Sequence, residues 1–318
     1  MTGETMNYAS VIVTYNRKKY LLKALESILN QEEPPTRVII VDNASTDGTD
    51  ELMSSNYKNN PIVKYHRLKT NGGGAMGFYQ GLKLVVKEDV DWISVADDDA
   101  FYDRSFFKVM DEATGKHPEI KAFTGTVYHG DNEIETLHRR WITNWHLMTE
   151  KEVPVSEYDH NYLFDQFTFV GVVLKKELVQ QIGFPRKEFF IWYDDSEYSI
   201  RVRKQTEIMN IINAKIYHQN VVSNGEWHWT PTWKEYYGIR NRIQIIKKYA
   251  SPRILGYVYL VYLYVRKMVA NTVKGERKGY RKFMYQVIND GFHDGLHNQL
   301  GKNDKYLPGM KIKRDNED

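Results

Sequence analysis

The chain has 318 residues, of which 42% are hydrophobic, and it can bury a sizeable core in one large domain or two small ones. Its 44 Lys and Arg residues against 41 Asp and Glu residues leave a net charge of +3, which excludes the basic bias of a dedicated nucleic-acid-binding protein. The absence of cysteine excludes disulfides, thiolate nucleophiles and Cys-ligated zinc. Residues 1–8 are polar and show no apolar secretion signal, so we expect a cytoplasmic protein.

Strands and helices are predicted to alternate in the first half of the chain. Apolar, β-branched residues over 9–15, 37–41 and 62–66 predict three buried strands. Apolar residues recur at helical spacing over 21–29, and another helix is predicted to open at Asp50. This alternation is typical of βαβ units and predicts an α/β fold with a mainly parallel sheet flanked by helices.

Polar residues follow the first two predicted strands. Thr14, Tyr15, Asn16 and Arg17 end the first strand, and Asp42 follows the second. Ligands of such sheets bind at the carboxyl ends of the strands, so these residues predict a nucleoside site. Arg17 would approach phosphate, and Asp42 would accept hydrogen bonds from a base or ribose. The alternative, that both residues merely cap helices, fits the sequence equally well.

Three adjacent glycines lie in the stretch 70–78 after the third strand. The stretch lacks the Lys-Ser/Thr and the spacing of a phosphate-loop fingerprint. Glycines nevertheless let a backbone approach a ligand closely, and a helix predicted over 78–86 would add an anion-binding N-terminus. We therefore predict that Asn71, Gly72 and Gly73 contact the nucleotide, with a flexible surface loop as the alternative.

Three consecutive carboxylates, Asp97, Asp98 and Asp99, come directly after the apolar run 91–96. Packed negative charges need water or a cation, and carboxylate oxygens are preferred ligands of Mg²⁺ and Mn²⁺, which commonly hold substrate phosphates. The triplet predicts a metal site that grips a diphosphate, against the alternative of a solvated acidic turn. A helix over 101–110 and a strand over 122–129 are predicted to follow.

A second acidic pair, Asp194 and Asp195, follows the aromatic run 189–193 at a predicted helix start. Two adjacent carboxylates suit a general base and a neighbour that orients it. The alternative is charge that complements the helix dipole, which explains one acid more easily than two. A strand over 167–174 and a helix over 175–182 are predicted before this pair.

Further candidates lie nearer the C-terminus. A short strand over 214–218 is predicted to end at His218, which could ligate the metal, although a lone histidine more often has another role. Arg240 is predicted to neutralise a departing diphosphate or, alternatively, to pair with surface acids. The tryptophan-rich stretch 227–233 would either cover a sugar or fill a hydrophobic gap. Three other histidines are predicted to be surface or packing residues: His138, His146 and His160.

The region 251–318 is basic and rich in aromatic residues. Its apolar run 254–265 is too short to span a bilayer, which needs about 20 helical residues. The basic residues that flank this run are typical of a helix on an anionic membrane surface, or equally of a core helix with a solvated basic face. A peripheral location on the cytoplasmic face of the inner membrane is the corresponding expectation.

The segments 10–17, 41–49, 97–99 and 192–195, in this order, resemble the inverting family 2 glycosyltransferases of GT-A fold. This resemblance covers about residues 8–250 of the chain. Within the family, the segments 71–78 and 190–198 are most similar to the galactofuranosyltransferases. The chain departs from their pattern at Tyr193 and at 74–77, near the presumed sugar pocket, where Trp192 also lies.

The resemblance implies transfer of galactofuranose from UDP-galactofuranose, with inversion, to a glycan or lipid-linked glycan in cell-surface polysaccharide synthesis. It implies Mn²⁺ or Mg²⁺ on Asp97, Asp99 and His218, with Asp98 near the donor. It also implies that Asp195 deprotonates the acceptor hydroxyl. Rhamnosyltransferases that use dTDP-rhamnose are the nearest competitor. A metal-dependent phosphohydrolase and a catalytically silent nucleotide-sugar-binding subunit are the rivals from other classes.

Three regions are predicted along the chain. A nucleotide-sugar-binding half of the GT-A domain covers 1–130, and an acceptor-binding and catalytic half of the same domain covers 131–250. A C-terminal helical, aromatic-rich extension covers 251–318. No nucleic-acid partner is expected, and assembly into a homo-oligomer is left open.

Overall fold

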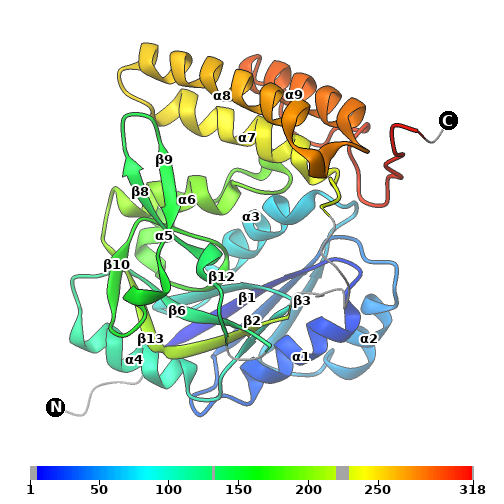
Figure 1. Cartoon of the computed structure of the whole chain (residues 1–318). Coiled ribbons are helices and arrows are strands. Elements are labelled where there is room, and N and C mark those ends of the chain that lie inside the picture. The colour runs from blue at the N-terminus through cyan, green and yellow to red at the C-terminus, as the bar shows by residue number, and fades with distance from the viewer. Residues whose placement is uncertain (1–5, 131–132, 220–228, 317–318) are drawn as a thin grey trace. The chain divides into compact units, whose positions relative to one another are not determined.

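The computed structural model describes residues 6–130, 133–219 and 229–316 (Figure 1). Within these residues the chain forms two compact units. The first consists of the described residues of 1–141, 151–187 and 195–220, and the second of those of 142–150, 188–194 and 221–318. Residues 227 and 228 of the tryptophan-rich stretch 227–233 lie outside the described residues.

The described strands are β1 Tyr8–Thr14, β2 Arg37–Asp42, β3 Val63–Arg67, β4 Trp92–Asp97, β5 Ala100–Tyr102, β6 Ala122–His129, β7 Glu133–Ile134, β8 Arg139–Asn144, β9 Thr149–Glu152, β10 Tyr162–Phe164, β11 Gln166–Phe167, β12 Val170–Lys175 and β13 Ile208–His218. The described α-helices are α1 Lys18–Leu29, α2 Thr49–Asn56, α3 Gly73–Val85, α4 Phe106–Lys116, α5 Lys176–Ile182, α6 Asp194–Arg203, α7 Lys234–Tyr249, α8 Arg253–Val273 and α9 Arg281–Leu296.

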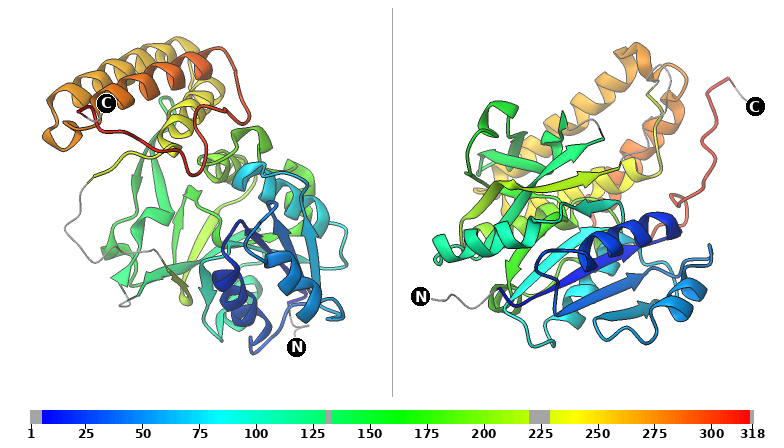
Figure 2. Two further views of the ribbon diagram at one scale, coloured as in Figure 1. Left: turned by 90° about the vertical axis from the view of Figure 1, so that its right-hand side faces the viewer. Right: turned by 90° about the horizontal axis from the view of Figure 1, so that it is seen from below.

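The core of the first unit is a sheet in the order β10-β13-β6-β12-β4-β1-β2-β3, with β5 beside β13 and β7 beside β6. Strands β4, β1, β2 and β3 run parallel, as predicted, and lie side by side in each view (Figure 2). The sheet is mixed because β12 is antiparallel to both β4 and β6. A separate three-stranded sheet has the order β11-β8-β9.

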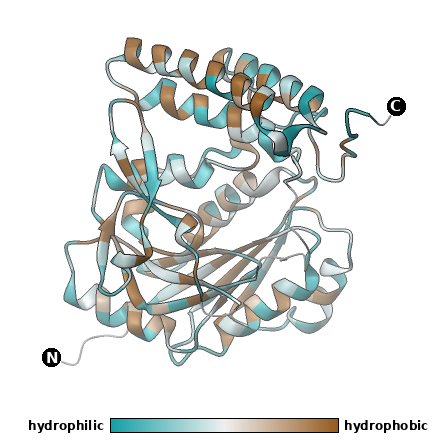
Figure 3. Ribbon diagram, in the orientation of Figure 1, coloured by the Kyte–Doolittle hydropathy of each residue, from teal (hydrophilic) through white to brown (hydrophobic). Residues whose placement is uncertain are grey.

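Both faces of the main sheet are covered, which explains the continuous apolar runs of its central strands (Figure 3). On β1, Ile12 packs on one face with the apolar stripes of α1 and α4. Val11 and Val13, which alternate with Ile12, pack on the other face with α3 and α5. The carboxyl ends of β1, β2 and β4 are thereby held in fixed register, and these ends carry the predicted site residues.

The helix predicted over 101–110 was placed too early. Residues Ala100–Tyr102 instead form β5, which pairs with the end of β13, and α4 begins at Phe106. Local sequence did not indicate this strand because its partner lies far along the chain. This pairing places Ala100 opposite His218, so it determines where the acidic triplet meets that histidine.

The second unit contains three packed helices, α7, α8 and α9. Two glycines of α9 permit a close approach to α7: a Cβ on Gly291 would lie 3.0 Å from Ile239 Cγ2, and one on Gly295 would lie 2.9 Å from Ile243 Cδ1. The 21-residue helix α8 is longer than its predicted apolar run. Among the described residues, no helix combines the length and apolar character that membrane crossing needs.

Candidate active site

The acidic triplet lies at the carboxyl end of β4, which runs between β1 and β12. Asp98 and Asp99 are buried, with 3% and 6% of their surface exposed, and Asp97 is half-buried. Asp98 accepts hydrogen bonds from Thr14 Oγ1 at 2.6 Å and from Arg17 at 3.1 Å. Arg17 also forms an ion pair with Asp99. The structure therefore brings the triplet together with the last residue of β1 and with Arg17 in the loop that follows.

Burial and the neighbouring charges shift the pKa values of the three carboxylates. Burial, together with the negative charges of Asp99 and Asp98, raises the pKa of Asp97 well above its ordinary value. Burial also raises the pKa of Asp98 to about 6, although its hydrogen-bond donors and Arg17 oppose the shift. Burial acts in the same direction on Asp99, but His218 and Arg17 outweigh it and lower the pKa. A divalent cation would compensate the charge that now disfavours ionisation of Asp97.

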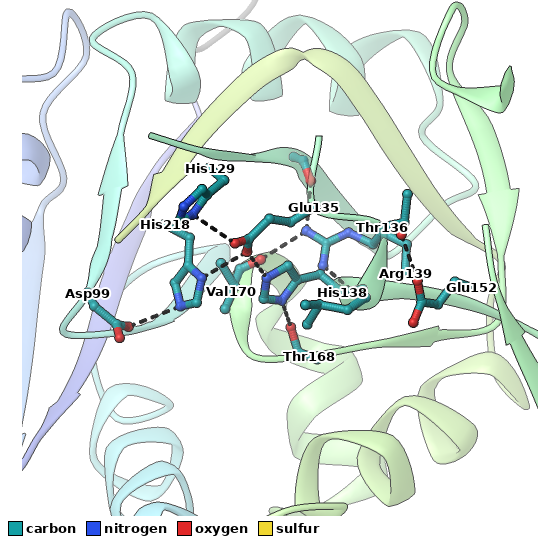
Figure 4. Close-up of polar contacts among 12 residues, drawn as sticks. Asp99, His129, Glu135, Thr136, His138, Arg139, Glu152, Thr168, Val170 and His218 are labelled. Carbon is teal, nitrogen blue, oxygen red and sulfur yellow. Dashed lines mark hydrogen bonds and ion pairs between the residues drawn. The ribbon is translucent and has the colours of Figure 1, made fainter. Parts of the chain in front are cut away.

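His218 reaches the triplet from the end of β13. Besides the β5 pairing, the backbone N of Gln219 donates to the carbonyl of Asp99 at 3.1 Å. His218 Nε2 lies 3.4 Å from Asp99 Oδ1, as Figure 4 shows. Burial lowers the pKa of His218, but hydrogen bonds and charges of Asp99 and Glu135 outweigh it and raise the pKa to about 10. Two carboxylates and an imidazole form a ligand set that suits Mn²⁺, and the carboxylates also suit Mg²⁺.

The second acidic pair opens α6, as predicted. Asp194 is buried, with 6% exposed, and Asp195 is half-buried. Asp195 Oδ1 accepts a hydrogen bond from the backbone N of Ser196 at 2.6 Å. The charge of Asp195 contributes to the raised pKa of Asp97, which means that Asp195 lies within electrostatic reach of the triplet. The first unit therefore combines the predicted metal ligands and the predicted base.

The loop before this pair has an uncommon backbone. Phe190, Trp192 and Tyr193 have φ angles of 66°, 62° and 68°, in the left-handed region, which costs bulky residues of order 1–3 kcal/mol each. Asn241 is fully buried and donates from Nδ2 to three backbone carbonyls within 189–192, at 2.9 to 3.0 Å. This amide holds the strained backbone that leads into the acidic pair.

Arg240 is engaged in the interior of the second unit. Its side chain is buried, and it donates to the carbonyls of Gly301 at 2.6 Å and Phe189 at 3.0 Å and to Asn241 Oδ1 at 3.0 Å. These partners all belong to the second unit and engage the guanidinium within the protein. We therefore interpret Arg240 as a residue that braces this unit, while its role at a departing diphosphate stays a prediction. Trp192, in the same unit, is 40% exposed.

Asn16 ties the loop after β1 to the loop after β2. Its backbone N donates to Ser45 Oγ at 2.8 Å, and its Oδ1 accepts from the backbone N of Thr46 at 2.7 Å. Asn16 adopts φ 53°, a left-handed value that asparagine tolerates better than most residues. Tyr15 is half-buried at the same strand end.

Asp42 is fully buried at the end of β2. Its Oδ1 accepts from the backbone N of Ser45 at 2.8 Å and from Ser45 Oγ at 2.5 Å, while Oδ2 accepts from Tyr65 OH at 2.5 Å. Both carboxylate oxygens are engaged within the protein. Asp42 thus orders the loop that follows β2, and its contact with a base or ribose stays a prediction.

The glycine-rich stretch forms the start of α3, which begins at Gly73 and not at residue 78. Asn71 Oδ1 accepts from the backbone N of Gly73 at 2.8 Å, and Gly72 precedes the helix as its N-cap. A Cβ on Gly77 would lie 2.3 Å from Val13 Cγ1, so this glycine allows α3 to pack closely on β1. The glycines thus place a helix N-terminus beside the strand ends.

Sequence reasoning missed Glu135, which accepts hydrogen bonds from His138 and His218. It lies in a region where the sequence pattern weakens, and no sequence signal identified it. His138 is buried, with 3% exposed. His146 and His160 are exposed, as predicted.

Solved structures support the fold assignment. The crystal structure of S. aureus TarS 1-349 matches with a TM-score of 0.58 and 16% identity, over 92% of this chain and 82% of that chain. GalNAc-T7 with UDP, GalNAc and Mn²⁺ matches with a TM-score of 0.63 and 12% identity, over 92% of this chain and 56% of that one. The fold is therefore of the GT-A glycosyltransferase class.

The family model described as Glycosyl transferase family 2 matches residues 10–173, more than half of the chain. The chain belongs to this family of glycosyltransferases. It is 33% identical over 197 residues to the galactofuranosyltransferase GlfT1 of Mycolicibacterium smegmatis, covering 61% of this chain and 64% of that protein. It is 44% identical over 92 residues to the abequosyltransferase RfbV of Salmonella typhimurium, covering 27% of each. Both matches span less than two thirds of the relative's length.

Proposed function

We propose that this glycosyltransferase moves galactofuranose from UDP-galactofuranose, with inversion, onto a glycan or lipid-linked glycan for cell-surface polysaccharide. The observation that carries the proposal is the gathering of Asp97, Asp99, His218 and Asp195 in the first unit. These are the groups that a metal-assisted transfer from a sugar diphosphate needs. The similarity to GlfT1 supports the choice of donor sugar.

Asp97, Asp99 and His218 would hold a Mn²⁺ or Mg²⁺ ion. The raised pKa of Asp97 and the 3.4 Å separation of His218 Nε2 from Asp99 Oδ1 fit a shared cation. When bound, such an ion supplies Lewis acidity that stabilises the diphosphate leaving group. Asp98, held by Thr14, keeps the positive charge of Arg17 close to the same place.

Asp195 would accept the proton of the acceptor hydroxyl. As the hydroxyl oxygen bonds to the anomeric carbon, the bond from that carbon to the diphosphate oxygen breaks, and UDP leaves with the electron pair. Attack on the side opposite the leaving group inverts the anomeric configuration. The buried Asp194 would orient its neighbour, and the loop held by Asn241 fixes the backbone before both.

A donor panel tests this proposal. The full-length protein is incubated with UDP-galactofuranose, UDP-galactopyranose or dTDP-rhamnose and a set of glycan and lipid-linked acceptors, with Mn²⁺ added or chelated. We expect a glycoside from UDP-galactofuranose with Mn²⁺, and its loss on chelation. A product formed from dTDP-rhamnose instead would assign the other donor. Release of free sugar or phosphate without a glycoside would indicate a hydrolase, and binding without turnover would indicate a silent subunit.

The proposal includes peripheral contact of α8 with an anionic membrane. Apolar side chains along this helix are exposed, and the ribbon shows bands of both hydropathies (Figure 3). Exposed apolar surface next to basic residues is typical of helices that lie in the interface of anionic bilayers. The exposed apolar residues are Ile254, Leu255, Tyr257, Val258, Val261, Tyr262, Val265, Val269 and Val273, and exposed basic residues nearby are Arg253, Arg266, Lys274, Lys278 and Lys282.

Flotation with anionic liposomes checks this contact. We expect the protein to float with the vesicles at low salt and to be released as salt rises, because salt screens the basic residues. The double change Val258→Glu and Val261→Glu should abolish flotation by placing two charges on the apolar surface. Val155→Glu, an exposed valine of the first unit, is the matched control and should float normally. Absence of wild-type binding at low salt would contradict the contact.

A further inference from the structure

The carboxylate of Glu135 contacts the side chains of three histidines in the first unit. Its Oε2 lies 2.7 Å from His138 Nε2 and 2.9 Å from His218 Nδ1, and its Oε1 lies 3.2 Å from His129 Nδ1. Figure 4 shows this carboxylate between the rings, with Asp99 beyond His218. A single carboxylate thus contacts the predicted metal ligand from the side away from the triplet.

The two nitrogens of His218 therefore have different partners. Nδ1 meets the carboxylate of Glu135, which can only accept a hydrogen bond, so Nδ1 carries a proton. Nε2 faces Asp99 Oδ1 at 3.4 Å. If a cation displaces the proton that Nε2 presents to Asp99, a proton fixed on Nδ1 leaves Nε2 as the nitrogen whose lone pair binds that cation.

Glu135 is itself held by the protein framework. Its backbone N donates to the carbonyl of Val127 at 2.9 Å, and the adjoining strand β7 pairs with β6. His138, which contacts the same carboxylate, is fixed on its other side by Thr168 Oγ1 at 2.6 Å from Nδ1. The neighbouring Arg139 is buried and donates to carbonyls of β6 and β12, at Gly125 and Val170. The carboxylate is thus held in place before any ligand binds.

We propose that Glu135 is a positioning residue, which orients His218 so that Nε2 presents its lone pair to the metal held by Asp97 and Asp99. The inference rests on the proposed function, because it requires that metal site. Glu135, His138 and His218 could in principle hold an ion themselves, since their ligand atoms lie within 4.8 Å of one another. The separations of 2.7 and 2.9 Å are instead those of direct hydrogen bonds, and both nitrogens of His138 are engaged.

Calorimetric titration of the full-length protein with Mn²⁺, in the presence of UDP, tests the inference. Glu135→Gln removes the charge and one acceptor, and we expect a loss of about tenfold or more in Mn²⁺ affinity. The matched control Glu133→Gln, at an exposed residue of the adjoining strand β7, should bind Mn²⁺ as the wild type does. His138→Gln should also retain binding, whereas loss of binding in that variant would overturn the inference in favour of an ion held by Glu135, His138 and His218.

A second measurement determines the protonation of His218 directly in the wild-type protein. Nitrogen NMR of histidine-labelled wild type with Mg²⁺ and UDP reports which nitrogen of His218 is protonated, with the signal assigned by its absence in His218→Gln. We expect the proton on Nδ1 and none on Nε2; the opposite tautomer would overturn the inference. If the wild type and Glu135→Gln bind Mn²⁺ with equal affinity, the proposed role of Glu135 is overturned, while the proposed metal site is not. Absence of Mn²⁺ binding in the wild type would overturn the proposed metal site as well.

Discussion

Replacement of Asp195 by asparagine should lower turnover by about 1,000-fold, the usual scale for loss of a general base. Asparagine keeps the shape of the side chain and its carbonyl oxygen, so the hydrogen bond from the backbone N of Ser196 can remain. It cannot take a proton from the acceptor hydroxyl. Steady-state kinetics with UDP-galactofuranose and calorimetry with UDP measure the two properties separately.

UDP binding should survive this change, because Asp195 is proposed to act on the acceptor and not on the nucleotide. Asp89→Asn, an exposed aspartate just before β4, provides the same chemical change outside the site and should retain wild-type turnover. Asp194→Asn should retain more activity than Asp195→Asn, because the neighbour only orients the base. Near-normal turnover of Asp195→Asn would show that another group accepts the proton.

Replacement of Asp99 by asparagine should weaken Mn²⁺ binding by at least about 100-fold, since the change removes a charged ligand and not merely a supporting group. Asp99 also contacts both His218 and Arg17, so the change removes a negative charge from beside each of these groups. UDP affinity should then no longer increase when Mn²⁺ is added. Calorimetry with UDP, with and without Mn²⁺, measures this coupling.

The Asp89→Asn variant again serves as the control and should keep the Mn²⁺-dependent gain in UDP affinity. Asp97→Asn should behave like Asp99→Asn, because both carboxylates are proposed ligands of one ion. An unchanged response to Mn²⁺ in Asp99→Asn would remove this residue from the metal site.

The parallel part of the sheet was predictable because its signal is local. The β-branched runs of β1 and β2 and the apolar spacing of α1 appear in short windows, and each reflects burial on a covered sheet. The helix α4 was predicted to start too early, which shows the limit of prediction from short windows of sequence. Residues Ala100–Tyr102 form a strand because β13, far along the chain, pairs with them, and no window of sequence contains both partners.

The residues of the candidate site were likewise predictable only where their sequence pattern is local. The acids of the triplet and of α6 were recognisable because adjacent carboxylates after apolar runs form a local pattern. Glu135 was not recognisable from the sequence. It contacts imidazoles on separate elements, and these meet only in the folded sheet. The contacts of Arg240 were not predictable either, because its guanidinium donates to carbonyls of residues 189 and 301, which are distant from it in sequence.

The stereochemistry of the product tests the central claim most directly, since it reports how the anomeric carbon reacts at the site of Asp195. The glycoside formed from UDP-galactofuranose is examined by NMR before and after the donor is consumed. A single displacement with Asp195 as base predicts an anomeric configuration opposite to that of the sugar in the donor. Retention of the donor configuration would contradict the account, because it requires a different reaction course.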